Sequence, residues 1–116
     1  MRIVVKSVWL AAVAAGLLLG SGPASAASAE KGKTLFVKHG CWQCHGFVGQ
    51  GGGAGPKLAP GPMPLEAMAN FIRNSDRRMP PYREAVLSNG DLADIHAYLA
   101  AVPAAPDPKT IPLLSQ

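Results

Sequence analysis

A chain of 116 residues has the length of a single domain, and its 11 Lys and Arg residues exceed its 7 Asp and Glu residues, giving a net charge of +4. The pI of about 9.4 would suit a nucleic-acid partner, but the chain has no basic run with interleaved aromatic residues. Length and charge therefore argue against a multidomain protein and predict no nucleic-acid binding.

The first 26 residues have the pattern of a secretory signal peptide. Arg2 and Lys6 make a positive start, an apolar run extends from Val8 to Leu19, and the small residues Ala24 to Ala26 form a cleavage site. We therefore expect residues 1–26 to be removed on export to the periplasm. The alternative is a retained anchor, but this apolar run is shorter than the ~20 residues that span a bilayer, so we expect no integral membrane segment after processing.

Export leaves a small and weakly charged domain. Without Arg2 and Lys6, nine Lys and Arg residues remain against seven Asp and Glu residues, a balance of +2. A second small-residue pattern, Ala27 to Ala29, leaves the cleavage site open by three residues. A domain of this size buries only about two-thirds of its unfolded surface, so we expect a cofactor or cross-link to stabilise it.

A first helix is predicted from Glu30 to about His39, and it leads into the most informative motif of the chain. Residues 41–45 read Cys-Trp-Gln-Cys-His, the signature of covalent haem attachment. Cysteines three apart on a helical turn point the same way, so each sulfur can form a thioether with one haem vinyl group, and His45 then lies under the iron. The motif predicts one haem c, attached through Cys41 and Cys44 and bound by His45.

The cysteine pair has two other interpretations. A thioredoxin-like dithiol would follow a strand, and the mature chain has no strand-like run. A structural zinc site needs four ligands, and beyond Cys41, Cys44 and His45 the chain offers only His39 and His96. The spacing therefore favours haem attachment over both.

Two irregular segments and a short helix follow the motif. Residues 46–55 contain six glycines, which predict a flexible loop that is either a mere connection or a close approach of backbone to the haem edge. Residues 56–64 contain four prolines and predict an irregular loop beside the haem. Leu65 to Arg73 predicts a helix, with Leu65, Met68 and Ile72 on one apolar stripe.

The second axial ligand decides the function, because a six-coordinate haem mostly transfers electrons whereas an open position binds gases or oxygen. The candidates are Met63, Met68, Met79, His39 and His96. Met68 fits the buried stripe of its helix, and His39 lies too close to Cys41 to cross easily to the other haem face. Met63 lies between two prolines and remains possible. Met79 precedes a proline pair, which places its thioether on a stiff, extended loop.

The chain resembles a known family through three motifs: Cys41 to His45, Gly55 to Leu58, and Met79 to Tyr82. Over residues 30–102 they closely resemble class I cytochromes c of the bacterial monohaem type. The resemblance implies an all-α, small cytochrome c fold, with three to four helices and irregular loops wrapped around one covalent haem. It implies that Met79 is the sixth ligand. It also implies that the Pro56 carbonyl accepts a hydrogen bond from His45, which orients the imidazole.

A last helix is predicted to run from its cap Ser88 to about Ala101, with Asp91 in the first turn, stopping before Pro103. Its apolar side comprises Leu92, Ile95, Tyr98, Leu99 and Val102. His96 lies at the flank of that side, and we expect it to be partly exposed.

In the resembled family the first and last helices cross where a small residue packs against an aromatic one. Gly32 and Phe36 against Ile95 and Tyr98 would reproduce that contact. We therefore expect a cytochrome c domain over residues 27–102. The remaining residues, 103–116, form a Pro-rich tail.

These features predict an electron carrier rather than an enzyme. A single six-coordinate haem would pass one electron between redox proteins, from a dehydrogenase or bc-type donor to an oxidase or other acceptor. The candidates to neutralise its propionates are Arg73, Arg77 and Arg78. A gas sensor with a labile Met79 and a permanently bound dehydrogenase subunit are the alternatives to a monomeric carrier. A peroxidase is disfavoured, because the distal motif offers no acid or base.

Overall fold

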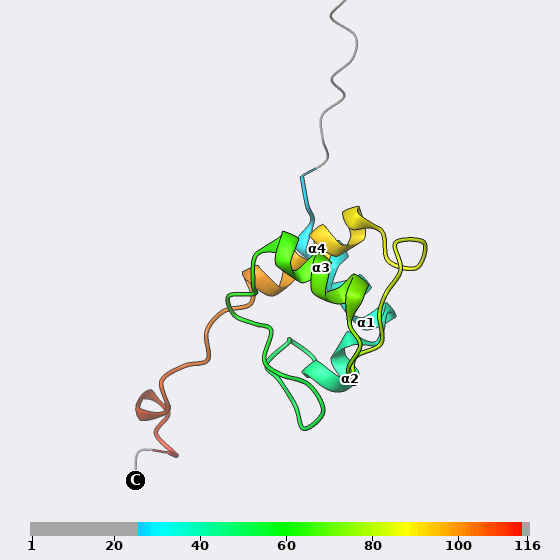
Figure 1. The fold of residues 1–116 in the computed structure, drawn as a ribbon. Helices are drawn as coiled ribbons and strands as arrows, with labels where there is room; N and C mark the ends of the chain where they lie inside the picture. Colours follow the sequence, from blue (N-terminus) through cyan, green and yellow to red (C-terminus); the bar gives the residue numbers. More distant parts are fainter. Residues whose placement is uncertain (1–25, 115–116) are drawn as a thin grey trace, which may run out of the picture.

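The computed structural model describes residues 26–114, so the predicted signal peptide, apart from Ala26, lies outside the described residues. Figure 1 follows the helices in chain order: α1 (Ala29–Lys38), α2 (Cys41–His45), α3 (Leu65–Asn74), α4 (Asn89–Ala101) and a short 3-10 turn, Pro108–Thr110. The described residues contain no strand. The predicted all-α fold is therefore confirmed.

The three longer helices begin and end within one residue of their predicted limits. Ser28 caps α1 by accepting a hydrogen bond from the Lys31 amide at 3.2 Å. Ser88 caps α4 in the same way, accepting from the Asp91 amide at 3.1 Å. Each cap satisfies an amide that the helix itself leaves without a partner. The cap predicted at Ser88 is confirmed.

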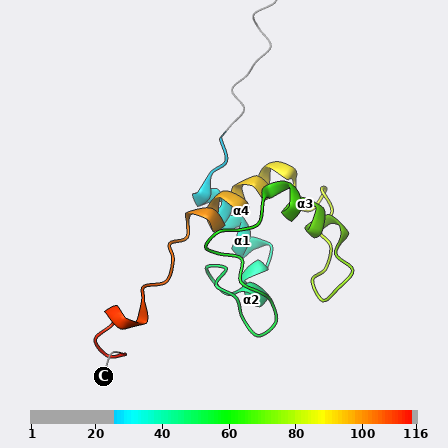
Figure 2. The ribbon, with the colours of Figure 1, turned by 60° about the vertical axis from the view of Figure 1, so that its left-hand side comes forward.

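The core of the molecule lies between α1 and α4, which pack side by side (Figures 1 and 2). Its buried side chains on these two helices are Leu35 and Phe36 of α1, and Leu92, Ile95, Tyr98 and Leu99 of α4. Burying each large apolar side chain stabilises the fold by about 1.5–3 kcal/mol. Val102, predicted on the same side of α4, is only partly buried.

The helices approach each other closely at Gly32. A Cβ atom at that position would overlap the carbonyl of Asp94 and lie 2.9 Å from the amide nitrogen of Ile95. One turn later, the fully buried Phe36 ring lies 5.7 Å from the ring of Tyr98, tilted by 58°. The crossing of a small and an aromatic residue that the resemblance implied is therefore confirmed.

Polar contacts fix the same pair of helices at their N-terminal ends. The Ser28 amide donates to Asp94 Oδ1 at 2.7 Å. Lys31 Nζ lies 2.8 Å from both Asp91 Oδ1 and Asp94 Oδ2. Hydrogen bonding to Lys31 holds the pKa of both carboxyls below its ordinary range, and the same bonds raise the pKa of Lys31.

The remaining elements surround this pair. α3 packs on α4 and buries Met68 (Figure 2). After α4, residues 103–114 run away from the helices in both views, and Leu113 and Leu114 are 82% and 64% exposed. Within the part of the chain that the structure describes, no helix has the length and apolar character needed to cross a membrane.

Candidate functional site

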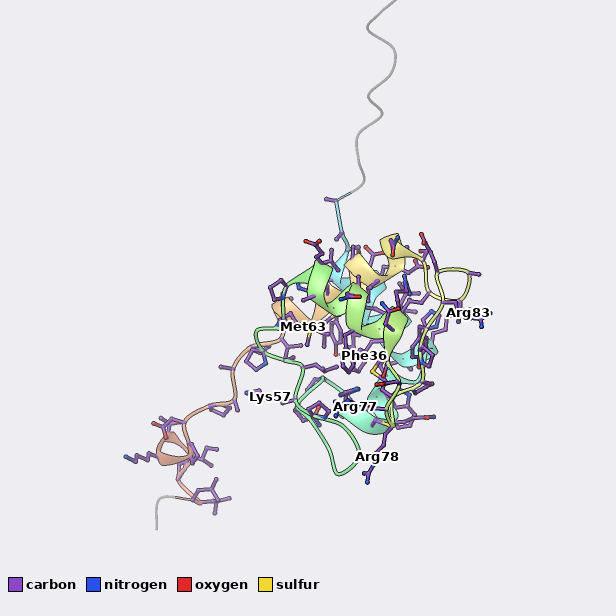
Figure 3. All side chains as sticks on the ribbon, viewed as in Figure 1. Phe36, Lys57, Met63, Arg77, Arg78 and Arg83 are labelled. Carbon is purple, nitrogen blue, oxygen red and sulfur yellow. The ribbon has the colours of Figure 1, made fainter. Side chains whose placement is uncertain are left out.

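A cavity of about 860 Å³ lies among the helices, a volume in the range of cofactor sites. Its walls come from all four helices and from the loops of residues 54–63 and 77–87. The lining is mostly apolar and reaches the core at Phe36, which is labelled in Figure 3 together with the lining residues Met63 and Arg77. The site is therefore a mostly apolar pocket with few polar groups.

The helix α2 supplies the chemistry-bearing wall. Gly40 turns the chain out of α1 in the left-handed conformation, with φ of 74°, which glycine adopts without strain. Cys41, Cys44 and His45 all line the cavity, because residues three and four apart share one face of a helix. Trp42 does not line it, and instead stacks on Phe47 with ring centroids 4.7 Å apart. One face of the motif thus presents two sulfurs and an imidazole to the cavity.

The imidazole of His45 is held in one orientation. The side chain is buried, and its Nδ1 atom lies 2.8 Å from the carbonyl oxygen of Pro56. A carbonyl can only accept, so Nδ1 carries the proton and Nε2 keeps a free lone pair. This is the contact that the resemblance implied, and it leaves Nε2 as the atom available to bind a metal.

The glycine-rich loop packs tightly against the motif, and its end at Gly55 also lines the cavity. The Gly51 amide donates to the His45 carbonyl at 2.8 Å. A Cβ atom at Gly52 would lie 2.9 Å from the Cys44 carbonyl oxygen, and one at Gly55 would lie 2.9 Å from both that oxygen and His45 Nδ1. The prediction of a flexible loop missed these contacts. Because glycine has no Cβ atom, the backbone of this loop can pack directly against α2.

The environment of Cys41 argues against dithiol chemistry. Burial raises the pKa of the Cys41 thiol above its ordinary value. A redox-active dithiol needs the opposite shift, since the thiolate is the attacking species. For a zinc site, the described residues contain no group of three or more His, Cys, Asp or Glu side chains placed to hold a metal ion. Neither alternative interpretation gains support.

Of the five candidate sixth ligands, three reach the cavity. Met63, Met68 and Met79 all line it, whereas His39 and His96 do not. Met68 is 5% exposed and belongs to the core, as its helical stripe predicted, and Met63 is 45% exposed. His96 is partly buried and lies outside the cavity, with Nε2 3.0 Å from the Met63 carbonyl oxygen.

The segment that carries Met79 is tied down on both sides. The hydroxyl of Ser75, itself buried, donates to the Met79 carbonyl at 2.8 Å. Beyond Met79, the Tyr82 amide donates to the Ile72 carbonyl at 2.9 Å, and the Tyr82 hydroxyl donates to the His39 carbonyl at 2.8 Å. Ser75 was not predictable as part of the site, because a serine after a helix carries no special signal, whereas Tyr82 belongs to the third motif.

The three arginines named as propionate partners have different environments. Arg77 and Arg78 line the cavity and are exposed. Arg73 does not line it, and its guanidinium is hydrogen-bonded to Tyr82, Leu87 and Asn89. Arg73 is therefore a poorer candidate for a propionate partner than Arg77 and Arg78, since both of its Nη atoms donate to protein acceptors.

An all-α fold around an apolar cavity, with a C-x-x-C-H helix on the cavity wall, defines a small monohaem c-type cytochrome. Residues 27–99 match the family described as cytochrome c oxidase, cbb3-type, subunit III, and the chain belongs to this family. No curated protein and no solved structure matches the chain significantly. The family assignment implies haem-based electron transfer by a class I c-type cytochrome.

The residues of the cavity fit the haem that the family implies. The two cysteines have the spacing for thioethers to one haem, and they share a wall with an imidazole whose Nε2 makes no hydrogen bond among the described residues. The apolar lining matches the hydrophobic faces of the macrocycle. The protein is thus a cytochrome c with one covalently attached haem c.

Proposed function

We propose that this chain is an exported carrier of single electrons, in which His45 and Met79 bind the haem iron from opposite faces. The observation that carries the proposal is that Cys41, Cys44, His45 and Met79 line one apolar cavity of about 860 Å³. When bound, the haem supplies an iron that alternates between the ferric and ferrous states and so holds one electron.

The protein residues orient and tune this centre. Pro56 accepts the Nδ1 proton of His45, which fixes the ring and increases the basicity of Nε2. The thioether of Met79 is a soft donor that favours the ferrous state and raises the reduction potential relative to a second histidine. The apolar lining acts in the same direction, because it disfavours the additional charge of the ferric state.

Met79 is a better candidate than the other two methionines. Ser75 holds the Met79 carbonyl from within the same segment, and Tyr82 ties the segment to His39, so the thioether can be held in place before coordination. Met63 is also anchored, because its carbonyl lies 3.0 Å from His96 Nε2, but its side chain is 45% exposed whereas that of Met79 is partly buried. Met68 is part of the hydrophobic core. These differences support Met79 as the sixth ligand.

The test uses the full-length protein produced in a host that attaches haem c. The expected product has a c-type haem spectrum, with both thiols blocked, and it is recovered from the periplasm without the first 26 or 29 residues. The oxidised protein should show the methionine-to-iron absorption band. A Met79→Ala variant should lose the band and bind carbon monoxide, and Met63→Ala should keep the band. Loss of the band in Met63→Ala alone would assign the ligand to Met63.

The family description supports a second candidate function, since it names an oxidase subunit. The chain would then be a permanently bound relay rather than a diffusing carrier. Gel filtration of the native, detergent-solubilised complex distinguishes the two, because a carrier elutes as a small protein and a subunit elutes with its complex. A gas-sensing role would instead require rapid, complete binding of carbon monoxide to the reduced wild-type protein.

A further inference from the structure

We propose that Arg73 positions the axial methionine, acting through the segment of residues 75–88 that connects α3 to α4. The proposal rests on the proposed coordination by Met79. This segment, called the ligand segment below, contains turns and bends but no helix. Its position therefore depends on contacts with the rest of the molecule.

The Arg73 guanidinium donates to three acceptors that come after Met79 in the chain. Nη1 donates to the Tyr82 carbonyl at 2.7 Å, and Nη2 donates to the Leu87 carbonyl at 2.7 Å and to Asn89 Oδ1 at 2.9 Å. Arg73 itself lies in the last turn of α3, before the segment begins. One side chain at the end of α3 thus joins the middle and the end of the ligand segment and the first residue of α4.

The acceptors include main-chain groups beside the cavity. Tyr82 and Leu87 line it together with Met79, and Leu87 is 2% exposed. Hydrogen bonds from a charged donor to such carbonyls are stronger than neutral ones, and a partly buried carbonyl that loses its donor costs free energy. The Arg73 contacts therefore favour the arrangement in which the chain just after Met79 stays against the cavity.

The network continues at the surface and explains why arginine is needed. Asn89 Nδ2 donates to Glu84 Oε1 at 2.8 Å, so Glu84 holds the amide that accepts from Arg73. A lysine ammonium has the same charge but lacks the planar fork that reaches three acceptors at once. Geometry, as well as charge, is thus required at this position.

The test compares Arg73→Gln and Arg73→Lys with Arg83→Gln in the haem-loaded protein. Arg83 lies in the same segment, its side chain has no hydrogen bond among the described residues, and Figure 3 shows it at the outer edge. The readouts are the methionine-to-iron band and the affinity of the ferric protein for imidazole. Imidazole binds the iron only when the methionine has dissociated, so a higher affinity means a less firmly held methionine. Global unfolding is followed separately by far-UV circular dichroism.

Both Arg73 variants are expected to weaken the band and to bind imidazole about tenfold more tightly, from the loss of charge-assisted hydrogen bonds. Arg83→Gln should match the wild type.

Unchanged imidazole affinity in Arg73→Gln would overturn the proposal. Wild-type behaviour of Arg73→Lys would show that charge alone suffices and would overturn the positioning role. If Arg73→Gln fails to fold, Asn89→Ala, which removes one acceptor, should show about a threefold effect. Absence of the band in the wild type would instead contradict Met79 coordination.

Discussion

The helix pair α1 and α4 and the ligand segment of residues 75–88 are held in place in different ways. The helix pair is joined by continuous apolar faces, with Gly32 at the crossing and Phe36 fully buried. The ligand segment has no regular structure. Hydrogen bonds that involve Tyr82 and Arg73 tie it to its neighbours, and a bond from Ser75 to the Met79 carbonyl holds it from within.

Because of this difference, we expect global folding stability and methionine coordination to respond to different substitutions. Apolar packing over two helices determines whether the chain folds, because many contacts contribute at once. A few directed hydrogen bonds determine where one thioether lies, because each bond fixes one point of an otherwise irregular chain. Changes in the helix pair should therefore lower global stability, whereas changes in the ligand segment should mainly alter the methionine ligand.

The largest expected effect is from Gly32→Leu. The new side chain must displace the backbone of α4 at Asp94 and Ile95, so we expect a loss of more than about 4 kcal/mol in the free energy of unfolding, or failure to fold. Urea denaturation followed by far-UV circular dichroism measures it. Gly53→Ala is the control, because a Cβ there meets nothing within 4 Å, and it should change stability by less than about 0.5 kcal/mol. Wild-type stability of Gly32→Leu would refute the close crossing.

Ser75→Ala tests the ligand segment. Removing the hydroxyl that donates to the Met79 carbonyl should increase imidazole binding to the ferric protein roughly fivefold to tenfold, with a cost of about 1 kcal/mol in global stability. Ser75→Thr keeps the donor and is the matched variant. Equal imidazole binding by wild type and Ser75→Ala would show that this bond does not hold the ligand.

Ser88→Ala should destabilise the helix pair modestly. It removes the cap of α4, and the free energy of unfolding should fall by about 1 kcal/mol, because the Asp91 amide loses its acceptor. Ser88→Asn retains a capping side chain and should stay close to the wild type. The methionine-to-iron band should be unchanged in both variants. A weakened band would mean that the two regions are coupled through the start of α4.

The smallest effect expected is a pH dependence of the helix pair. The carboxyls of Asp91 and Asp94 have lowered pKa values, so their contribution is present above the ordinary value of 3.8 and is lost as the pH falls through the folded-state values. The raised pKa of Lys31 gives a contribution that is present below 10.5 and is lost as the pH rises through the folded-state value. Between pH 3.8 and pH 10.5, the contribution of Lys31, Asp91 and Asp94 to folding stability should therefore not change with pH.

Lys31→Gln checks this dependence. The variant should lose less Tm than the wild type between about pH 5 and about pH 3, since its carboxyls are no longer paired with the ammonium. The difference should be small and salt-sensitive, because Lys31 is 57% exposed. Lys33→Gln on the same helix is the control. An equal loss of Tm in wild type and Lys31→Gln would show that the Lys31 ammonium contributes nothing to this pH dependence.

The helices were predictable because their signals are local. The stripe from Leu92 to Leu99 and the cap at Ser88 depend on residues within a few positions of each other, and the observed α4 follows them. The motif of residues 41–45 is equally local, since one helical turn brings its two cysteines and His45 to one face. The assignment of Met79 as the sixth ligand stays a prediction that the coordination experiments test.

The contacts that support the site were not predictable in the same way. Gly52 and Gly55 appeared as parts of a flexible loop, but they pack on the Cys44 carbonyl. Arg73 appeared as a partner for propionates, yet its donors meet main-chain acceptors as far along the chain as Leu87. No short pattern encodes such pairs, since they depend on how the loops fold back.

The sequence alone determined where the helices lie and where the haem-attachment motif lies, because periodicity, caps and fixed spacings act over one or two turns. The crossing of the first and last helices was expected only from the family resemblance. Only the tertiary structure decided that three methionines reach the cavity while His39 and His96 do not, and that Arg73 serves the backbone. Those outcomes depend on the paths of the irregular segments. Such segments are positioned by hydrogen bonds and close backbone contacts between residues distant in the chain.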